Sequence, residues 1–290
     1  ENELDAKLTI PEGHINPPVV ILVHGSGPID MDVTVGETRM FYDLSRGLAI
    51  NGIATLRYNK RTKEHPEECG DDITLKEETI DDAVMAYEII KERDDINTNA
   101  IFYLGHSLGA IATPRILKAT EARGALMTAP SSRRLSELVY DQLEYIYKLS
   151  DDQIDNEEQA SLQALEMQNA KLDSFLAGEI EEPAHLPLGL KGTYYEYLEE
   201  YDVLAETREL NRPLLIIFGE KDYQVSEKDM TLFKENLNGD DNSTIEVLEG
   251  LNHAMMEVEE QSSPEDYQEE RHVSMEYLNT ITSWIVDRSH

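Results

Sequence analysis

The sequence predicts an α/β fold: a mostly parallel, doubly wound sheet with a helical cap insertion. Short apolar runs alternate with longer segments of helical periodicity, the pattern of a sheet with helices on both faces. Most of these runs are nearly continuous, as in strands buried on both faces. The alternation stops after Pro130 and resumes near residue 210. We therefore expect one large domain, with a core of residues 1–130 and 210–290 and a helical cap at residues 131–209.

Strands and helices of the predicted core follow one another along the chain. The expected strands are Leu4 to Ile10, Val19 to His24, Ile53 to Tyr58, Ala100 to Leu104, Gly124 to Ala129, Leu214 to Gly219 and Thr244 to Leu248. The expected helices are Thr38 to Ile50, Lys76 to Glu92, Leu108 to Thr120, Glu227 to Leu237 and Val273 to Val286.

The predicted cap, residues 131–209, combines negative charge with aromatic residues. It contains 19 acidic and 6 basic residues, together with 7 of the 14 tyrosines in the chain. Two interpretations stay open at this point. The tyrosines pack the cap helices onto the core, or some of them line a substrate pocket, since open α/β sheets bind ligands at the carboxyl ends of their strands.

The chain as a whole is strongly acidic. It has 25 Lys and Arg residues against 59 Asp and Glu residues, a formal net charge of −34 over 290 residues. This charge repels phosphate backbones and anionic lipid head groups, so nucleic acid and membrane surfaces are poor candidate partners. It also suggests the hypothesis of adaptation to a salty environment, where counterions screen the self-repulsion.

Further features predict a soluble protein without an intrachain disulfide or a Cys-rich metal site. No apolar run approaches the roughly 18 to 20 residues of a membrane-spanning helix, and Glu1-Asn2-Glu3 lacks the basic-then-apolar pattern of a leader peptide. A cytoplasmic location is therefore favoured over secretion, although a removed leader or preceding domain stays open. The single cysteine, Cys69, can form neither an intrachain disulfide nor a Cys-rich metal site.

The pentapeptide Gly105-His106-Ser107-Leu108-Gly109 is typical of a nucleophile elbow. It follows a predicted strand and precedes a predicted helix, as that turn requires. Small residues two positions on either side of the serine allow strand and helix to approach closely while the serine side chain is exposed. Ser107 is therefore the candidate nucleophile.

A serine hydroxyl is a weak nucleophile, so a base must take its proton and a third group must orient that base. Asp222 follows the strand predicted at Leu214 to Gly219, and His253 follows the next one. Both would face the elbow. Glu220 is an alternative to Asp222, and His272 is a weaker alternative to His253. His106 is expected to point elsewhere, and His24 to pack or to shape the neighbouring loop.

Attack on a carbonyl also needs donors for the developing oxyanion. One donor is the backbone N–H of Leu108, at the start of the helix after the elbow. The second is expected from the loop His24-Gly25-Ser26-Gly27-Pro28, and we choose the N–H of Ser26. A phosphate-binding loop is disfavoured because the lysine and the spacing are missing.

These residues together resemble a known family. The run from Val20 to Asp32, the segment Leu56 to Thr62, the elbow and the segment Gly219 to Val225 are similar to bacterial α/β-hydrolase carboxylesterases of the EstD and cinnamoyl (feruloyl) esterase type. The resemblance extends over roughly residues 4–286 and is least specific in the insertion. It implies metal-independent hydrolysis of a short acyl or aryl ester, a small-molecule partner, by Ser107, Asp222 and His253. It also implies that Ser26 and Leu108 supply the oxyanion N–H groups.

The chain departs from the family pattern at two positions. Val33 follows Asp30-Met31-Asp32 where the family has Glu, and Asn59 replaces Asp in the Arg-Tyr-Asp-Lys-Arg pattern. Both lie outside the triad, so they bear on substrate preference or loop structure. The basic residues Arg57, Lys60 and Arg61 either bind an acidic substrate group or pair structurally with Asp30 and Asp32.

The same triad serves peptidases, amidases and thioesterases, and these remain alternatives. Members that cleave oligopeptides usually carry a large extra domain, which this chain lacks, so ester hydrolysis is slightly favoured. A dehalogenase would carry Asp as the nucleophile at the elbow, and a dienelactone hydrolase would carry Cys. Ser107 argues against both. A non-catalytic binding protein on the same scaffold is a further alternative. No residue is assigned to substrate binding, and the oligomeric state is open.

Overall fold

The computed structural model describes residues 3–70, 72–149 and 152–290. Glu1 and Asn2, part of the segment judged to lack a leader pattern, lie outside the described residues. The described chain has a seven-stranded sheet in the order β1-β5-β2-β6-β7-β8-β9. Its strands are β1 Ala6–Thr9, β2 Val19–Val23, β5 Ala54–Tyr58, β6 Ile101–His106, β7 Gly124–Thr128, β8 Leu214–Gly219 and β9 Ser243–Leu248. Within this seven-stranded sheet of the described residues, the β1–β5 pairing is antiparallel and the other pairings are parallel.

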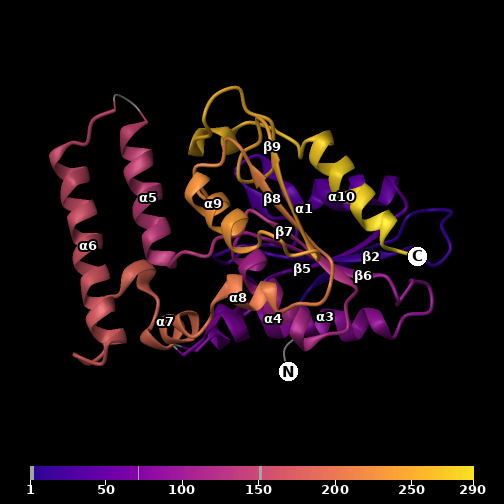
Figure 1. Ribbon diagram of the computed structural model, residues 1–290, viewed down its shortest axis with the longest axis horizontal. Helices are drawn as coiled ribbons and strands as arrows, with labels where there is room; N and C mark the ends of the chain where they lie inside the picture. The colour runs from indigo at the N-terminus through magenta and orange to yellow at the C-terminus, as the bar shows by residue number, and fades with distance from the viewer. Residues whose placement is uncertain (1–2, 71, 150–151) are drawn as a thin grey trace.

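Helices cover both faces of this sheet (Figure 1). The helices α1 Met40–Ile50 and α10 Met275–Asp287 contact each other on one side, and α3 Asp81–Lys91 and α4 Leu108–Ala119 contact each other on the other. Helix α9 Glu227–Asn236 follows β8 and places Phe233 edge-on against Phe218 of that strand. Strands β2, β5, β6, β7 and β8 are buried throughout, which explains why most of their residues are apolar.

The seven predicted strands are all present, and two helices differ from expectation. Thr38 and Arg39 form a short strand, β4, paired with β3 Thr34–Val35, so the first helix begins at Met40. The helix expected from Lys76 begins with a π-helical turn, η2 Lys76–Ile80, before α3. Short helices α2 Arg61–Glu64 and η1 Pro66–Glu68 follow β5, and η4 Pro264–Gln268 precedes α10.

Residues 131–149 and 152–209 lie between β7 and β8, and the regular elements in these described ranges are helices, as predicted. They are α5 Leu135–Lys148, α6 Asn156–Leu176, η3 Pro187–Gly189, α7 Gly192–Glu199 and α8 Val203–Arg208. Helices α5 and α6 contact each other and form an arm beside the sheet domain in Figure 1, whereas α8 contacts α4. A small separate core of Leu172, Leu186 and Tyr195 joins α6 to the chain around α7.

The tyrosines of the insertion pack rather than line the main cavity. Tyr201 donates a hydrogen bond to the carbonyl of Ile111, and Tyr145 stacks on Tyr223 with ring centroids 5.2 Å apart. Tyr194 and Tyr195 are buried. Among the described residues, the tyrosines that line the cavity beside Ser107 are Tyr223 and Tyr267, both outside the insertion. The interpretation of cap tyrosines as pocket walls is therefore wrong for this cavity.

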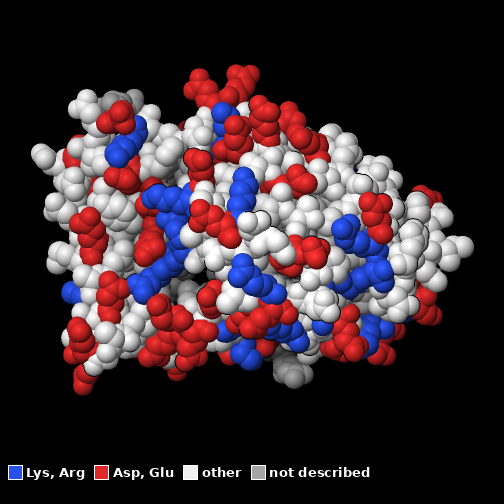
Figure 2. Space-filling view, in the orientation of Figure 1, with Lys and Arg blue, Asp and Glu red and all other residues white. Residues whose placement is uncertain are grey.

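Acidic side chains cover much of the face shown in Figure 2, with Lys and Arg side chains interspersed among them. Many of the Lys and Arg side chains form ion pairs with acidic side chains. Arg133, for example, pairs with both Asp141 and Asp229. Within the described ranges, no helix has the length and apolar character needed to cross a membrane.

Candidate active site

Ser107 lies in the sharp turn between β6 and α4. Its backbone is in the left-handed region, with φ 55° and ψ −118°, a strained conformation for a residue other than glycine. The two glycines of the pentapeptide are required by space. A Cβ on Gly109 would lie 2.3 Å from the Val23 carbonyl oxygen, and one on Gly105 would lie 2.4 Å from that of Gly109. The turn thus presents Ser107 at the end of a buried strand, as the spacing predicts.

Asp222 and His253 meet in a buried hydrogen bond. His253 Nδ1 lies 2.6 Å from Asp222 Oδ2, and the two residues are 5% and 3% exposed. The second carboxylate oxygen, Oδ1, accepts the N–H groups of Gln224 at 2.7 Å and Val225 at 3.0 Å. Both oxygens of Asp222 are therefore occupied, which fixes the carboxylate and, through it, the imidazole.

The loops that carry this pair approach each other at Gly219. A Cβ there would lie 2.4 Å from the carbonyl oxygen of Leu251. The N–H of Lys221 also donates to that carbonyl at 2.9 Å. The sequence order of strand, aspartate, strand and histidine becomes a spatial pair because β8 and β9 are parallel neighbours.

The alternative residues lie elsewhere. Glu220 is exposed and accepts the N–H of Gly250 at 3.0 Å. His272 is exposed and lies 3.1 Å from Asp43. Neither lines the cavity that Ser107 and His253 share.

The loop after β2 lies directly beside Ser107. A Cβ on Gly25 would lie 3.2 Å from the Ser107 Cβ, and Gly25 and Ser26 both line the shared cavity. In the described part of the chain the Ser26 N–H has no acceptor. Leu108 is the first residue of α4, so its N–H has no partner within the helix. Two backbone donors are thus free at the cavity.

The segment after β5 holds this loop. The Met31 N–H donates to Asn59 Oδ1 at 2.9 Å, and the Lys60 N–H donates to the Ile29 carbonyl at 3.2 Å. Arg57 Nε forms an ion pair with Asp32 Oδ1 at 2.8 Å.

The structural interpretation of the basic cluster is correct, but its expected partners were only partly right. Arg57 pairs with Asp32 as expected. Lys60 pairs instead with Glu78, and Arg61 with Asp82. The reason is topological: the chain turns away from the loop after Lys60 and runs beside the start of α3.

The cavity has a volume of about 540 Å³ and a mostly apolar wall. Its lining is formed by residues that are mostly apolar, with some amides, hydroxyls and two histidines: Gly25, Ser26, Ile29, Val33, Val35, Thr38, Met40, His106, Ser107, Leu108, Ile111, Ala129, Ser131, Leu135, Leu138, Val139, Gln142, Leu188, Tyr223, Gln224, Val225, His253, Ala254, Pro264, Tyr267 and Gln268. None of these described lining residues is Asp, Glu, Lys or Arg.

Two buried histidines beside the site are kept neutral. Burial lowers the pKa of His24 and of His106 from 6.5 to about 3 in each case. His106 Nε2 lies 2.9 Å from the His253 carbonyl oxygen, and the two rings are 4.7 Å apart. His24 packs between Phe41 and Tyr58. The packing expected for His24 agrees with its contacts. The expectation that His106 points elsewhere is wrong, because its side chain lines the cavity and its ring packs against that of His253.

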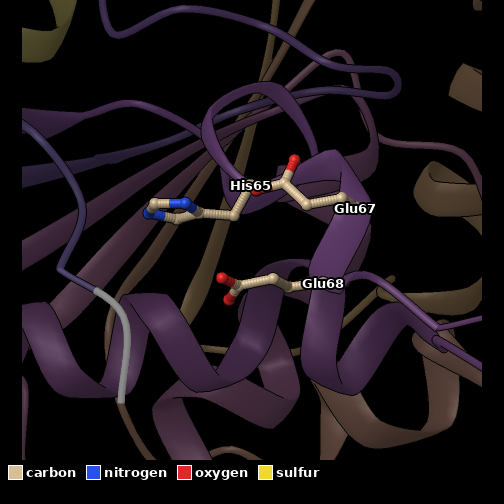
Figure 3. A group of neighbouring side chains, drawn as sticks. All are labelled: His65, Glu67 and Glu68. Carbon is tan, nitrogen blue, oxygen red and sulfur yellow. The ribbon is translucent and has the colours of Figure 1, made fainter.

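A possible metal-ligating cluster lies apart from the cavity. The ligand atoms of His65, Glu67 and Glu68 lie within 4.8 Å of one another, and Figure 3 shows the His65 and Glu68 side chains extending toward the same side. His65 Nε2 already lies 2.9 Å from the Glu3 carbonyl, and both glutamates are exposed. This cluster carries no metal assignment, and independence from metals stays a prediction.

Comparison with known proteins gives a consistent picture. No family model matches the chain. The chain is 39% identical over 288 residues to Esterase EstD of Thermotoga maritima, an alignment that covers 98% of this chain and 66% of EstD. The chain has the α/β-hydrolase fold and is a homologue of Esterase EstD. It spans about 66% of the length of that curated relative.

Solved structures share this fold at low sequence identity. Est1E from Butyrivibrio proteoclasticus has 18% identity and a TM-score of 0.57, covering 98% of this chain and 92% of Est1E. Est1E with bound ferulic acid has 16% identity and a TM-score of 0.59, covering 98% and 95%. An esterase from Pyrococcus furiosus has 16% identity and a TM-score of 0.56, covering 99% and 92%.

Sequence reasoning missed several residues of the EstD homologue's cavity. Tyr223 and Gln224 follow Asp222 directly, so their position in that loop was a usable signal. Val33 comes from the segment after β2, where its departure from the family pattern was a signal for substrate preference, whereas Tyr267 comes from η4 and carried no such signal. Val33 replaces the glutamate of the family pattern, so the departure noted in the sequence places an apolar side chain in the wall.

Proposed function

We propose that this protein is a serine carboxylic ester hydrolase that acts on small, uncharged acyl or aryl esters. The observation that carries the proposal is the buried His253–Asp222 hydrogen bond of 2.6 Å, beside a cavity that also contains the strained Ser107 turn. The homology to an esterase supports the same reaction class.

In the proposed mechanism His253 acts through its Nε2, because Nδ1 is bonded to Asp222. It takes the proton of Ser107 as the serine oxygen attacks the ester carbonyl. The N–H groups of Ser26 and Leu108 stabilise the oxyanion, and His253 then gives its proton to the leaving alcohol. Water repeats the cycle on the acyl-enzyme, which releases the acid and restores Ser107.

The cavity wall supports the substrate class. A volume of about 540 Å³ lies within the range of small-molecule sites. The described lining has neither a carboxylate to hold the ammonium of a free amino terminus nor a basic side chain for the phosphates of a coenzyme A thioester. Neutral esters therefore fit this wall better than the substrates of an aminopeptidase or of a coenzyme A thioesterase.

We further propose that residues 131–209 act as a cap on this site. Helix α5 supplies Leu135, Leu138, Val139 and Gln142 to the cavity, and Leu188 comes from η3. Changes in these side chains should alter which acyl or alcohol groups fit without changing the triad.

The test is hydrolysis of p-nitrophenyl esters from acetate to decanoate, together with methyl ferulate. Ser107→Ala should lose activity by about 10⁶-fold in kcat while remaining folded. Ser26→Ala is the matched control, because the proposed donor is a backbone N–H that alanine retains, and it should stay within about threefold. Activity in Ser107→Ala would refute the nucleophile assignment. Wild-type protein that hydrolyses no ester and does not react with a fluorophosphonate probe would favour the binding-protein alternative.

A further inference from the structure

A buried lysine contacts the loop that carries the proposed oxyanion donor. Lys60 Nζ donates a hydrogen bond of 2.8 Å to the carbonyl oxygen of Gly25. Lys60 is 2% exposed, so this charged group has been taken almost completely out of water. Such burial is costly unless the charge is paired and hydrogen-bonded.

The geometry of the peptide bond connects this contact to the proposed chemistry. The carbonyl of Gly25 and the N–H of Ser26 belong to one planar trans peptide unit, so they point in opposite directions. A donor fixed on the carbonyl side therefore sets the direction of the N–H on the other side. The charge-assisted hydrogen bond also polarises the unit, which makes the Ser26 N–H a better donor.

Two more residues hold Lys60. Glu78, in the π-helical turn η2, forms an ion pair with Lys60 Nζ through Oε1. Its other oxygen, Oε2, accepts a 2.7 Å hydrogen bond from the hydroxyl of Tyr194 in α7. Burial lowers the pKa of Lys60, and the carboxylate of Glu78 acts in the opposite direction. The Lys60 amine can donate to Gly25 in either protonation state.

We propose that Lys60 is a positioning residue for the ester hydrolysis proposed above: it holds the Gly25–Ser26 peptide so that the Ser26 N–H faces the oxyanion. Glu78 and Tyr194 hold Lys60 in turn. Because Tyr194 lies in the insertion, a continuous line of hydrogen bonds joins α7 to the oxyanion loop. The inference rests on the proposed function. Its test is therefore designed so that a failure of the Lys60 proposal and a failure of the proposed function give different results.

The test uses a pair of variants of the full chain. Glu78→Gln alone keeps the Lys60 donor on Gly25, whereas Lys60→Met with Glu78→Gln removes that donor without leaving an unpaired buried carboxylate. Each is assayed for kcat and KM on the best p-nitrophenyl ester and for inhibition by an aryl boronic acid, whose tetrahedral adduct on Ser107 places an oxygen in the oxyanion hole.

Loss of a whole oxyanion donor costs about 10²- to 10³-fold, so a misdirected donor should cost about 10- to 100-fold in kcat. We expect this loss in the double variant, with KM within about threefold and boronate affinity weakened by a similar factor to kcat. Glu78→Gln alone should stay within about fivefold. A merely structural role for Lys60 would lower thermal stability without selectively weakening the boronate.

A folded double variant with wild-type kcat and boronate affinity would overturn the Lys60 proposal. If Ser107→Ala is inactive in the same assay, the proposed function survives that result. Arg61→Gln is the matched control, because Arg61 pairs with Asp82 in the same segment without contacting the loop. Should the double variant not fold, Lys60→Leu with Glu78→Gln carries the same expectation, since it too removes the donor to Gly25 without leaving an unpaired buried carboxylate.

Discussion

Replacing Asp222 by asparagine should place the proton of His253 on the wrong nitrogen. Oδ1 of Asp222 accepts two backbone N–H groups, from Gln224 at 2.7 Å and Val225 at 3.0 Å, and only an oxygen can do this. In Asp222→Asn the amide oxygen therefore stays in that position and the NH₂ group faces His253 Nδ1. Nδ1 must then accept, which leaves the proton on Nε2, the nitrogen that should take it from Ser107.

The structure also limits how often the amide can flip. The flipped amide leaves two backbone donors without an acceptor, at about 1 kcal/mol or more each. A total of about 2 kcal/mol keeps the flipped form near 3%. Because even this form lacks the charge that stabilises the imidazolium, we expect kcat to fall about 10⁴-fold. This loss corresponds to about 5.4 kcal/mol of transition-state stabilisation.

The assay is the steady-state rate on the best p-nitrophenyl ester, with fold checked by circular dichroism. Glu220→Gln is the matched control, since the exposed Glu220 carboxylate accepts the Gly250 N–H and does not line the cavity, so kcat should stay within about threefold. A folded Asp222→Asn protein with kcat within tenfold of wild type would refute the tautomer argument. A large loss in Glu220→Gln would move the orienting role to that residue.

Three further predictions concern the fold and its surroundings. Gly109→Ala should lower the free energy of unfolding in urea by about 2 kcal/mol or more, because its Cβ would lie 2.3 Å from the Val23 carbonyl oxygen. Gly70→Ala, which has open space around it, should be nearly neutral, and equal effects of the two substitutions would contradict the packing argument. The pKa of His24 is lowered from 6.5 to about 3, so as pH falls between these values the unfolded chain takes up a proton before the folded chain does, and the free energy of unfolding decreases. Between pH 7 and pH 5 the wild type should lose about 2 kcal/mol more of this free energy than His24→Gln, and equal losses in the two proteins would refute the linkage. Raising NaCl from 0.01 M to 1 M shortens the screening length from about 30 Å to about 3 Å, which weakens the repulsion caused by the net charge of −34. The thermal unfolding temperature should therefore rise by about 3 °C or more, whereas equal stability at the two salt concentrations would refute the salt-adaptation hypothesis.

Local signals explain what the sequence could predict. Strands such as β2 and β8 are read from continuous apolar runs because both of their faces are buried. The glycine spacing predicts the turn at Ser107, because a side chain at either glycine would collide with backbone a few residues along the chain or on the adjacent strand. The order of Asp222 and His253 predicts their meeting because successive parallel strands end at the same edge. Their catalytic roles remain proposals.

Long-range contacts explain what the sequence could not predict. The partner of Lys60 lies 18 residues further on, in a π-helical turn that helical periodicity does not distinguish from the α-helix it precedes. The role of Tyr194 depends on a contact across 116 residues. The start of α1 shifted because Thr38 pairs with Val35 in a two-residue strand, too short to give a strand pattern. Each of these depends on which segments meet, and one sequence contains no direct record of that.

The segment after β5 shows how the fold can present an unpaired donor to a substrate. Strand β5 lies beside β2, so the residues that follow the two strands emerge at the same edge. Asn59 bonds Met31, and Lys60 bonds both Ile29 and Gly25, so the loop is held at three points from one side. Asn59 makes its contact through an amide oxygen, which explains why the change from the family's aspartate leaves the loop attached. Held in this way, the loop need not use the Ser26 N–H for its own stability. Ser26 is exposed, so its N–H remains open to a substrate and can donate to the oxyanion that develops at the transition state.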